Sequence, residues 1–389
     1  MDLRFVLIIT FLTVMNAGYV ALQVSLLRRR RPWPAFVGWA VGAWIVVMQA
    51  LFFLVIFSPQ WAEPFLRRWF FFPLAVETVW NVLIIGLICP LMILVVLAMR
   101  RLRPVKPDAP PLSPEGLSRR QFLYLAAYSA APVAAIGMGV HGTLSRDDLR
   151  VNRMAIPITG LPPELEGFTI AHVSDLHAGL FVGPERLRQI HDATNDLKAD
   201  LIAITGDIIN NNMTEFPDAL ACVRGLESRH GVWLCEGNHD LIPGFGIVDR
   251  ACRENGLAML RNTGTAINVE GRRLLLAGLP WMKMGFEGHP EIIDTLYPRR
   301  QEGDVRVLLA HHPHLFDIAD STDLVLAGHT HGGQIMLGPV GIGPCFFNYW
   351  SGLYRRGNTN LVVSNGCGDW FPCRIGAPAE IGLLRLTKA

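Results

Sequence analysis

The chain has 389 residues and a formal net charge of +2 at pH 7, so it is long enough for more than one domain. Its lysines and arginines are scattered through the C-terminal half instead of forming a basic patch, so nucleic acid is excluded as an expected partner. The first hundred residues are almost continuously apolar with arginines at the breaks, whereas the sequence beyond residue 150 has the composition of a soluble α/β domain.

Three long apolar stretches come first in the chain. Residues 5–27, residues 33–57 and a stretch that ends at Met99 each reach the roughly 20 residues that cross a bilayer. A helix buried in a protein core is the alternative, but three such lengths with almost no charge favour membrane spans. We therefore expect residues 1–103 to form a transmembrane region with three helices.

The basic residues between these stretches predict their orientation. A run of four arginines at 28–31 separates the first two stretches, and a basic cluster at 100–106 follows the third. Loops rich in lysine and arginine stay in the cytoplasm, so the third span should exit there. Arg67 and Arg68 lie in the opposite loop and count against this orientation, but the bias still favours it.

A linker and a further apolar segment follow. Residues 104–120 are rich in proline, as in an extended spacer, and end in Ser118-Arg119-Arg120; the segment 121–145 is then largely apolar. This pattern resembles a twin-arginine export signal, which would make the Tat translocase a partner; a fourth membrane span is the other interpretation. Both predict a protein of the bacterial inner (cytoplasmic) membrane with the domain 150–389 on the extracytoplasmic side. A buried amphipathic helix at 121–145 would contradict that placement.

The domain 150–389 alternates predicted strands with predicted helices. Pro184 suits the first turn of a helix, and Leu187, Ile190 and Thr194 follow on one face. Residues 247–255 predict a second helix, closed by Gly256. Strands are also expected at 274–277 and 361–364. This alternation is typical of a layered αββα sandwich or of a βαβ sheet.

Five short apolar runs in this domain, each expected to be a buried strand, end at residues that bind metal ions. Because ligands in open α/β sheets lie beyond the carboxyl ends of the strands, we expect all five to meet at one edge of one sheet. The runs and the motifs after them are 170–173 before Asp175-Leu176-His177, 201–204 before Gly206-Asp207, 232–234 before Gly237-Asn238-His239-Asp240, 307–310 before His311-His312-Pro313, and 324–327 before Gly328-His329-Thr330-His331.

The chemistry of these side chains predicts a site for two metal ions. Asp175 and His177 are two residues apart, as are His329 and His331, so each pair can point the same way from an extended segment. Asp207 supplies a carboxylate that can bridge two cations. Nitrogen and oxygen ligands without thiolate favour Mn²⁺, with Fe or Zn²⁺ as alternatives, over Ca²⁺ or Mg²⁺. The candidate ligands are too many for one tetrahedral ion and about right for two. They are Asp175, His177, Asp207, Asn238, His311, His329 and His331.

The order of the motifs resembles the calcineurin-like metallophosphoesterases, which carry Asp-x-His, Gly-Asp-x-x-Asp/Asn, Gly-Asn-His-Asp/Glu, a His before x-Pro, and Gly-His-x-His. The resemblance covers residues 155–381, and the flanks at 161–165 and 374–378 are similar to the membrane-linked, YkuE-like branch. It implies a four-layer αββα sandwich that binds two divalent metal ions. Asn210 ends a motif that often carries Asp, at a position outside the direct ligands.

The resemblance also implies a role for each residue. A metal-activated hydroxide would attack phosphorus in line, and His239, oriented by Asp240, would be the acid or the electrostatic partner at the leaving oxygen. His311 is the expected ligand in preference to His312, because the ligand precedes x-Pro, and His314 is expected at the surface. The first metal would be held by Asp175, His177 and His331, the second by Asn238, His311 and His329, with Asp207 bridging both.

Three functions remain open at this stage. The first is hydrolysis of a phosphate mono- or diester of the cell envelope, lipid-linked esters included, by a membrane-anchored enzyme. The second is an inward-facing pyrophosphatase that acts on a nucleotide-activated lipid of the UDP-diacylglucosamine type. The third is a metal-stabilised sensor without turnover, which the intact set of ligands disfavours.

Two further groups of residues remain unassigned. Cys367 and Cys373 could close a small disulfide loop, since an extracytoplasmic domain permits it, or could be unpaired buried thiols. Four aromatic residues could contact lipid or pack inside the domain, and we expect them to pack: Phe346, Phe347, Tyr349 and Trp350.

Overall fold

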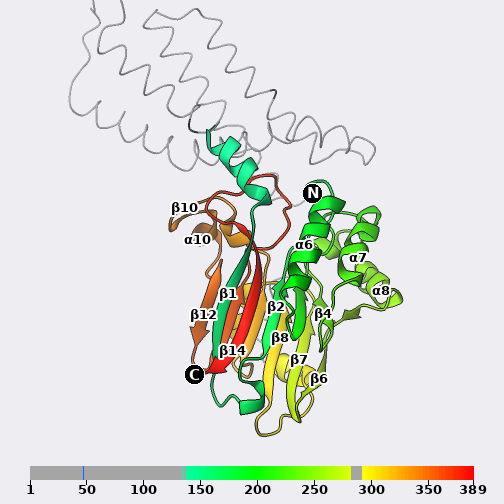
Figure 1. The fold of residues 1–389 in the computed structure, drawn as a ribbon, viewed down its shortest axis with the longest axis vertical. Helices are drawn as coiled ribbons and strands as arrows, with labels where there is room; N and C mark the ends of the chain where they lie inside the picture. Colours follow the sequence, from blue (N-terminus) through cyan, green and yellow to red (C-terminus); the bar gives the residue numbers. More distant parts are fainter. Residues whose placement is uncertain (1–46, 48–133, 135–136, 282–290) are drawn as a thin grey trace, which may run out of the picture. The chain divides into compact units, whose positions relative to one another are not determined.

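The computed structural model describes residues 47, 134, 137–281 and 291–389 (Figure 1). The chain divides into two compact units, Met1–Thr143 and Leu144–Ala389, and the features below belong to the second. The expected spans within 1–103, the linker 104–120 and most of the segment 121–145 lie outside the described residues. Within the described part of the chain, no helix is both long and apolar enough to cross a membrane.

The first sheet of the domain has six strands in the order β1-β14-β2-β3-β4-β5. From β2 to β5 the strands are parallel, whereas β14 runs antiparallel to β2 and parallel to β1. The strands are β1 (Leu149–Ile158), β14 (Ala379–Lys388), β2 (Thr169–Val173), β3 (Leu201–Thr205), β4 (Val232–Cys235) and β5 (Ala258–Met259).

The second sheet also has six strands, in the order β12-β13-β9-β8-β7-β6. Its four central strands are parallel, and the edge strands β12 and β6 are antiparallel to their neighbours. A two-stranded hairpin, β10 (Met336–Leu337) with β11 (Val340–Gly341), stands apart. The strands of the sheet are β12 (Gly352–Arg356), β13 (Thr359–Val363), β9 (Leu324–Ala327), β8 (Val305–Ala310), β7 (Arg272–Leu279) and β6 (Thr263–Val269).

The two sheets pack face to face between layers of helix. Successive side chains of a strand point to opposite faces, and on β3 Leu201 and Ala203 join the core between the sheets, whereas Ile202 and Ile204 join the core under the helices. Figure 1 shows α6, α7 and α8 along the outer side of the first sheet. The outer face of the second sheet has its own core, to which α9 contributes Ile293. The result is a four-layer mixed α/β domain.

The helices agree in part with the sequence patterns. The helix predicted from Pro184 is α6 (Pro184–Asp196), and the helix predicted at 247–255 is α8 (Ile247–Glu254). Three short helices were not predicted: α7 (Phe216–Arg224), α9 (Glu291–Leu296) and α10 (Ile342–Phe346). α9 and α10, with six and five residues, are too short for a periodic pattern to stand out from their surroundings.

One expectation about the strands was wrong. The five ligand-bearing strands do not end at one edge of one sheet, because β2, β3 and β4 belong to the first sheet and β8 and β9 to the second. The two sheets present the carboxyl ends of these strands at the same end of the domain, so the motifs still converge. Each strand pattern reports only that a strand is buried on both faces, and it carries no information about which sheet the strand joins.

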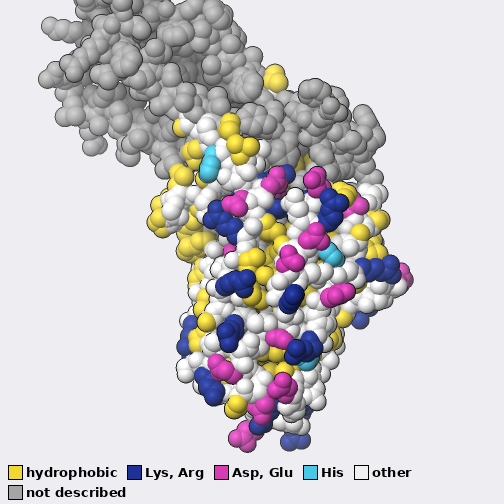
Figure 2. Space-filling view, in the orientation of Figure 1, with side chains coloured by type: hydrophobic (Ala, Val, Ile, Leu, Met, Phe, Trp, Pro, Cys, Tyr) yellow, Lys and Arg dark blue, Asp and Glu magenta, His cyan; other side chains and the backbone are white. Residues whose placement is uncertain are grey.

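The strand β1 was also missed, for a local reason. It contains Pro157, which cannot donate a backbone hydrogen bond and is therefore found in edge strands. In the structure β1 is indeed the edge of the first sheet, with Pro157 opposite Thr387 of β14. On the face of the domain shown in Figure 2, basic and acidic side chains are interspersed.

Candidate metal centre

The seven expected ligands occupy the loops that leave five strands at one end of the domain. Asp175 and His177 follow β2, Asp207 follows β3, and Asn238 follows β4 in the first sheet. The other ligands come from the second sheet, where His311 follows β8 and the pair His329 and His331 follows β9. The site therefore lies across the junction between the two sheets.

The backbone of the site is held in an unusual conformation. Among the described residues, nine side-chain-bearing residues have positive φ, and five of these are expected ligands, with φ between 45° and 71°. Left-handed backbone is disfavoured for such residues and persists where the surrounding structure enforces it, often at functional sites. Here it turns the side chains after each strand towards a common point. The five are Asp175, His177, Asp207, His329 and His331.

One group of ligand atoms gathers around Asp175. Nε2 of His331 lies 3.3 Å from Asp175 Oδ1 and 3.1 Å from Nε2 of His177. Nε2 of His177 is 3.8 Å from the same carboxylate oxygen. All three side chains are buried. Their ligand atoms are close enough to share one cation.

Asp207 joins this group to a second one. Its Oδ2 lies 3.4 Å from Nε2 of His177 and 3.2 Å from Nε2 of His311. Its Oδ1 accepts a hydrogen bond from the backbone N–H of His239 at 2.8 Å. A single carboxylate thus faces one imidazole from each expected metal site, which is the position that a bridging ligand requires.

The second group is completed at the mouth of the site. Oδ1 of Asn238 lies 2.8 Å from Nδ1 of His329, and both residues are half-buried. The backbone N–H of His329 donates to both oxygens of Asp175, at 3.1 and 3.2 Å. The ligand loops of β2, β4 and β9 are therefore linked directly.

The arrangement fits divalent cations. Nδ1 of His311 lies 2.6 Å from the carbonyl oxygen of Thr205 and donates to it, so the buried Nε2 is the nitrogen that faces the carboxylates and that a metal would bind. Metal-binding histidines are commonly oriented in this way. Burial keeps the pKa of His177 and of His329 well below the usual value, so both imidazoles are neutral at pH 7 and able to bind.

The carboxylates of Asp207 and Asp175 give His311 a pKa that differs from those of His177 and His329. Burial lowers the pKa of His311, but the charges of Asp207 and Asp175 outweigh it and raise this pKa to about 10. Burial raises the pKa of Asp207, but the charges of His311, His177 and His239 and the hydrogen bond with His311 together lower it overall. The carboxylates are thus ionised and concentrate negative charge where cations would bind.

His239 is close to this cluster but is not oriented as expected. Its Nδ1 lies 2.5 Å from the backbone carbonyl oxygen of Asn210, and its ring is 4.6 Å from that of His177 between centroids. We expected Asp240 to orient His239. Instead, the buried carboxylate of Asp240 accepts three backbone N–H groups, from Gly237, Ile208 and Ile209. Asp240 therefore ties together the loops after β3 and β4, and Asn210 orients His239 through its main chain.

The neighbouring histidines lie outside the cluster. Nδ1 of His312 is 2.9 Å from Nδ1 of His314, and the ring of His312 stacks on that of His329 with centroids 5.0 Å apart. His311, and not His312, reaches the carboxylates. His314, expected at the surface, is half-buried beside His312.

The sequence analysis missed two side chains beside the site. Arg374 is fully buried, and one of its Nη2 hydrogens points to Nδ1 of His331 at 3.2 Å, while its Nε donates to Asp369 at 2.5 Å. Trp281 follows β7, with its ring centroid 4.7 Å from that of His329. Arg374 belongs to the flank at 374–378, whose resemblance to the family could have indicated a residue near the site. No feature of the sequence pointed to Trp281.

The loop that carries Arg374 wraps the first ligand. The backbone N–H of Gly368 donates to the carbonyl of Asp175 at 2.8 Å, and that of Cys367 to the carbonyl of Ser174 at 2.9 Å. Cys367 and Cys373 are buried free thiols in the structure. The loop therefore holds the Asp175 segment through hydrogen bonds.

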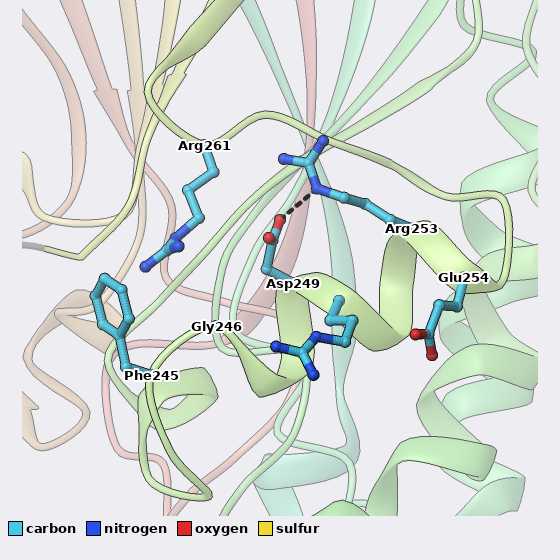
Figure 3. A pocket seen from close by; sticks show the side chains of 7 residues that line it. Phe245, Gly246, Asp249, Arg253, Glu254 and Arg261 are labelled. Carbon is cyan, nitrogen blue, oxygen red and sulfur yellow. Dashed lines mark hydrogen bonds and ion pairs between the residues drawn. The ribbon is translucent and has the colours of Figure 1, made fainter.

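A pocket beside the Asn238–His239 segment does not enlarge the site. It is lined by Phe245 and Gly246, by residues of α8, and by Arg261, which lies between β5 and β6 (Figure 3). Arg253 pairs with Asp249 at 2.9 Å, and Arg261 pairs with Glu236 at 3.1 Å. Arg250 also lines the pocket, and none of the expected ligands does.

A two-sheet α/β domain that gathers carboxylates and neutral imidazoles into adjacent clusters at its strand ends has the site of a metallophosphoesterase. The sequence model of the calcineurin-like phosphoesterase family matches residues 168–333, which include all seven expected ligands. The uncharacterized metallophosphoesterase YkuE of Bacillus subtilis is 31% identical over 289 residues, covering 70% of this chain and 98% of YkuE. The chain therefore belongs to the calcineurin-like phosphoesterase family, and it is a phosphoesterase, a hydrolase.

Two further relatives show how widely the domain occurs. The phosphodiesterase YaeI of Escherichia coli is 27% identical over 283 residues, covering 70% of this chain and 100% of YaeI. A transmembrane protein with metallophosphoesterase domain from Danio rerio is 29% identical over 258 residues, covering 62% of this chain and 58% of the relative. The chain thus matches little more than half the length of the fish protein.

Proposed function

We propose that this protein is a membrane-anchored phosphoesterase that uses two divalent metal ions to hydrolyse a phosphate mono- or diester of the cell envelope. The observation that carries the proposal is the position of Asp207, whose Oδ2 lies within 3.4 Å of both His177 and His311. Mn²⁺ is the metal that we favour, with Fe or Zn²⁺ as alternatives, since the ligands are nitrogen and oxygen without thiolate.

The chain provides two sets of ligands around this carboxylate. Bound divalent cations supply Lewis acidity and bring the pKa of water from 15.7 to near ~7, which yields a nucleophile at neutral pH. The first cation would be held by Asp175, His177 and His331, and the second by Asn238, His311 and His329, with Asp207 shared. Asn238 and His329 are half-buried, so the substrate would approach from their side.

His239 is the residue that we assign to proton transfer. The carbonyl of Asn210 accepts from its Nδ1, which leaves Nε2 able to give or take a proton. A ring nitrogen of His239 lies within 4.8 Å of ligand atoms of His177 and Asp207. His239 is also half-buried, so a leaving oxygen could reach it from solvent.

The membrane part of the proposal is supported by the sequence and by a relative. Residues 1–103 contain three stretches of bilayer length, and the Danio rerio relative is named a transmembrane protein. The arginine bias favours an exit of the third span into the cytoplasm. The apolar segment 121–145, as an export signal or a fourth span, would then bring the catalytic domain to the extracytoplasmic side of the bacterial inner membrane. Arg67 and Arg68 favour the inward-facing alternative, a pyrophosphatase on a nucleotide-activated lipid.

A substrate screen with metal analysis tests the catalytic proposal. The full-length protein, purified in detergent, would be assayed on a panel of phosphate mono- and diesters with Mn²⁺, and its metal content measured on the same sample. We expect about two transition-metal ions per chain and hydrolysis of at least one ester. Protein that binds metal but hydrolyses nothing on the panel would leave only the sensor function, and protein that binds no metal would overturn the proposal.

Reporter fusions test the orientation. Alkaline phosphatase activity after a fusion at Ala389 supports the extracytoplasmic placement, whereas fluorescence of a green fluorescent protein fused there supports the inward-facing alternative. Because the Tat route exports folded proteins, the fluorescent fusion would also be tested in a strain without that translocase. Fluorescence confined to the cytoplasm in both strains contradicts the outward placement.

A further inference from the structure

A long segment without charge follows the last metal ligand. From residue 332 to residue 354 the chain contains no Asp, Glu, Lys, Arg or His. Within it, β10, β11 and α10 present three large apolar side chains to solvent, Leu337 at 47%, Val340 at 60% and Phe346 at 73% exposure. We call these three side chains the apolar tip. Three such residues on one short segment are unusual for a surface in contact with water alone.

The base of this segment is attached firmly to the metal centre. The hydroxyl of Thr330, between two ligands, donates to the carbonyl of Trp350 at 2.7 Å, and the ring of Phe347 meets that of His329 edge-on at 5.8 Å. Phe347, Tyr349 and Trp350 are half-buried, as expected of residues that pack, whereas Phe346 faces outward. The apolar tip therefore projects from the rim of the catalytic site.

A neighbouring loop adds an aromatic side chain. Trp370 is 49% exposed, and its loop is tied to the base of the tip by two hydrogen bonds, from Gln334 Nε2 to the carbonyl of Phe371 at 2.9 Å and from the Met336 N–H to the carbonyl of Ile375 at 2.7 Å. Exposed tryptophan beside exposed aliphatic residues is typical of surfaces that meet the interface of a bilayer. Figure 2 shows hydrophobic side chains gathered over the end of the domain that carries β10 and α10.

The topology brings the start of the domain to the same end. β1 begins at Leu149 opposite Ala379, the first residue of β14, and β14 runs antiparallel to β2. The start of β1 therefore lies at the end of the sheet where β2 delivers Asp175.

We propose that the apolar tip inserts into the surface of a lipid bilayer, so that the metal site receives the phosphate of a lipid headgroup at the membrane surface. This inference rests on the proposed function and specifies its substrate class. The absence of charge over 23 residues favours lipid over a protein partner, because rims of protein interfaces are polar. A second copy of the chain is the competing occupant.

An environment-sensitive fluorophore on Cys345 tests the insertion. Among the described cysteines Cys345 is exposed and the others are buried, so labelling in a Cys89→Ser background is selective. The full-length protein would be reconstituted in vesicles of phosphatidylethanolamine and phosphatidylglycerol that contain doxyl-labelled lipid. We expect the emission to be quenched by at least half. Val340→Glu and Phe346→Glu should abolish the quenching, because a carboxylate is costly to place in a bilayer.

Gln301→Glu is the matched control. It adds the same charge at an exposed position shortly before β8, at the opposite end of the domain, and should leave the quenching and the hydrolysis of a soluble diester unchanged. Absence of quenching in the parent protein overturns the inference, as does equal quenching in the two tip variants. A signal that depends on protein concentration and not on doxyl lipid assigns the tip to contact between copies, which also overturns it.

The two proposals can fail separately. Metal content and hydrolysis of a soluble diester by the parent protein, measured in detergent on the same preparation, report the catalytic site alone. Turnover without lipid quenching removes the membrane insertion and leaves the phosphoesterase. Lipid quenching without turnover or bound metal removes the proposed function instead.

Discussion

Oδ2 of Asp207 lies 3.2 Å from Nε2 of His311, although the two residues follow strands of different sheets. The contact joins the loop after β3 to the loop after β8. The two residues are 104 positions apart, so they are not neighbours in the sequence. The metal centre therefore depends on the packing of the two sheets as much as on its ligands.

Replacing the shared carboxylate should remove both metals. In Asp207→Asn we expect transition-metal content to fall below one ion per chain and hydrolysis to fall by more than about 100-fold, because loss of residues that only support ligands already costs ~10–100-fold. Asp196→Asn, at the exposed end of α6, is the control and should retain metal and activity. Full metal content in Asp207→Asn would show that this carboxylate is not shared.

Replacing His239 should lower turnover and leave the metal content unchanged. We expect His239→Ala to keep its metals and to lose about 10²–10⁴-fold in kcat on substrates with poor leaving groups, the usual contribution of a general acid. The loss should be smaller for a nitrophenolate leaving group, which needs no proton. His230→Ala, beside Phe168 away from the metal centre, serves as the matched histidine variant. Equal losses on both kinds of substrate would contradict proton donation by His239.

A methyl group at Gly237 should disrupt the site. A Cβ there would collide with Oδ1 and the backbone nitrogen of Asp207, so Gly237→Ala should reduce metal content strongly. Gly271 has positive φ with open space around it, and Gly271→Ala should cost only about 1 kcal/mol of unfolding free energy and keep its metals. The comparison separates steric collision at the ligand from backbone strain. Equal metal content in the two variants would be evidence against the close approach of Gly237 to Asp207.

Breaking the buried pair of Arg374 and Asp369 should lower both the stability of the fold and the affinity for metal. Arg374→Met removes the hydrogen-bonded partner of the buried Asp369 carboxylate and leaves Arg146, 3.9 Å away, as its remaining ion pair. It should lower the unfolding free energy by about 3 kcal/mol. It should also weaken metal binding by about 10–100-fold, because Arg374 contacts His331. In Arg374→Met/Asp369→Asn the stability should partly recover while the metal affinity stays low. Recovery of both together would show that Arg374 acts only on the fold.

One carboxylate far from the metals predicts the response to acid. Burial raises the pKa of Asp304, but hydrogen bonds from Arg273 and from the Gln301 N–H lower it overall, below its usual value of 3.8. A lowered pKa stabilises the fold above the pKa of the unfolded chain, and this stability is lost as pH falls through the folded value. Asp304→Asn should therefore be less stable than the parent by about 1 kcal/mol at pH 7.

The difference should shrink towards zero as the pH falls below 4, which thermal unfolding at pH 7 and pH 3 can measure. Asp218→Asn, exposed in α7, controls for the loss of one charge. A difference that stays the same at both pH values would assign the effect of Asp304 to hydrogen-bond geometry and not to its charge.

The residues that gather at the candidate site could be predicted from the sequence, because five of the predicted strands end in motifs whose side chains have one kind of chemistry. Asp175-Leu176-His177 and His329-Thr330-His331 carry their spacing locally, and the order of the five motifs is specific to one family. The same local reasoning located α6 from Pro184 and the apolar positions after it.

The tertiary structure alone decided how these parts meet. It placed β8 and β9 in a second sheet, assigned the orientation of His239 to the carbonyl of Asn210 instead of Asp240, and brought Arg374 to His331 from 43 positions along the chain. These relationships depend on which apolar faces pack together over long sequence separations. A pattern of neighbouring residues reports that a strand is buried, whereas the free energy of burial, shared across the whole core, determines what it is buried against.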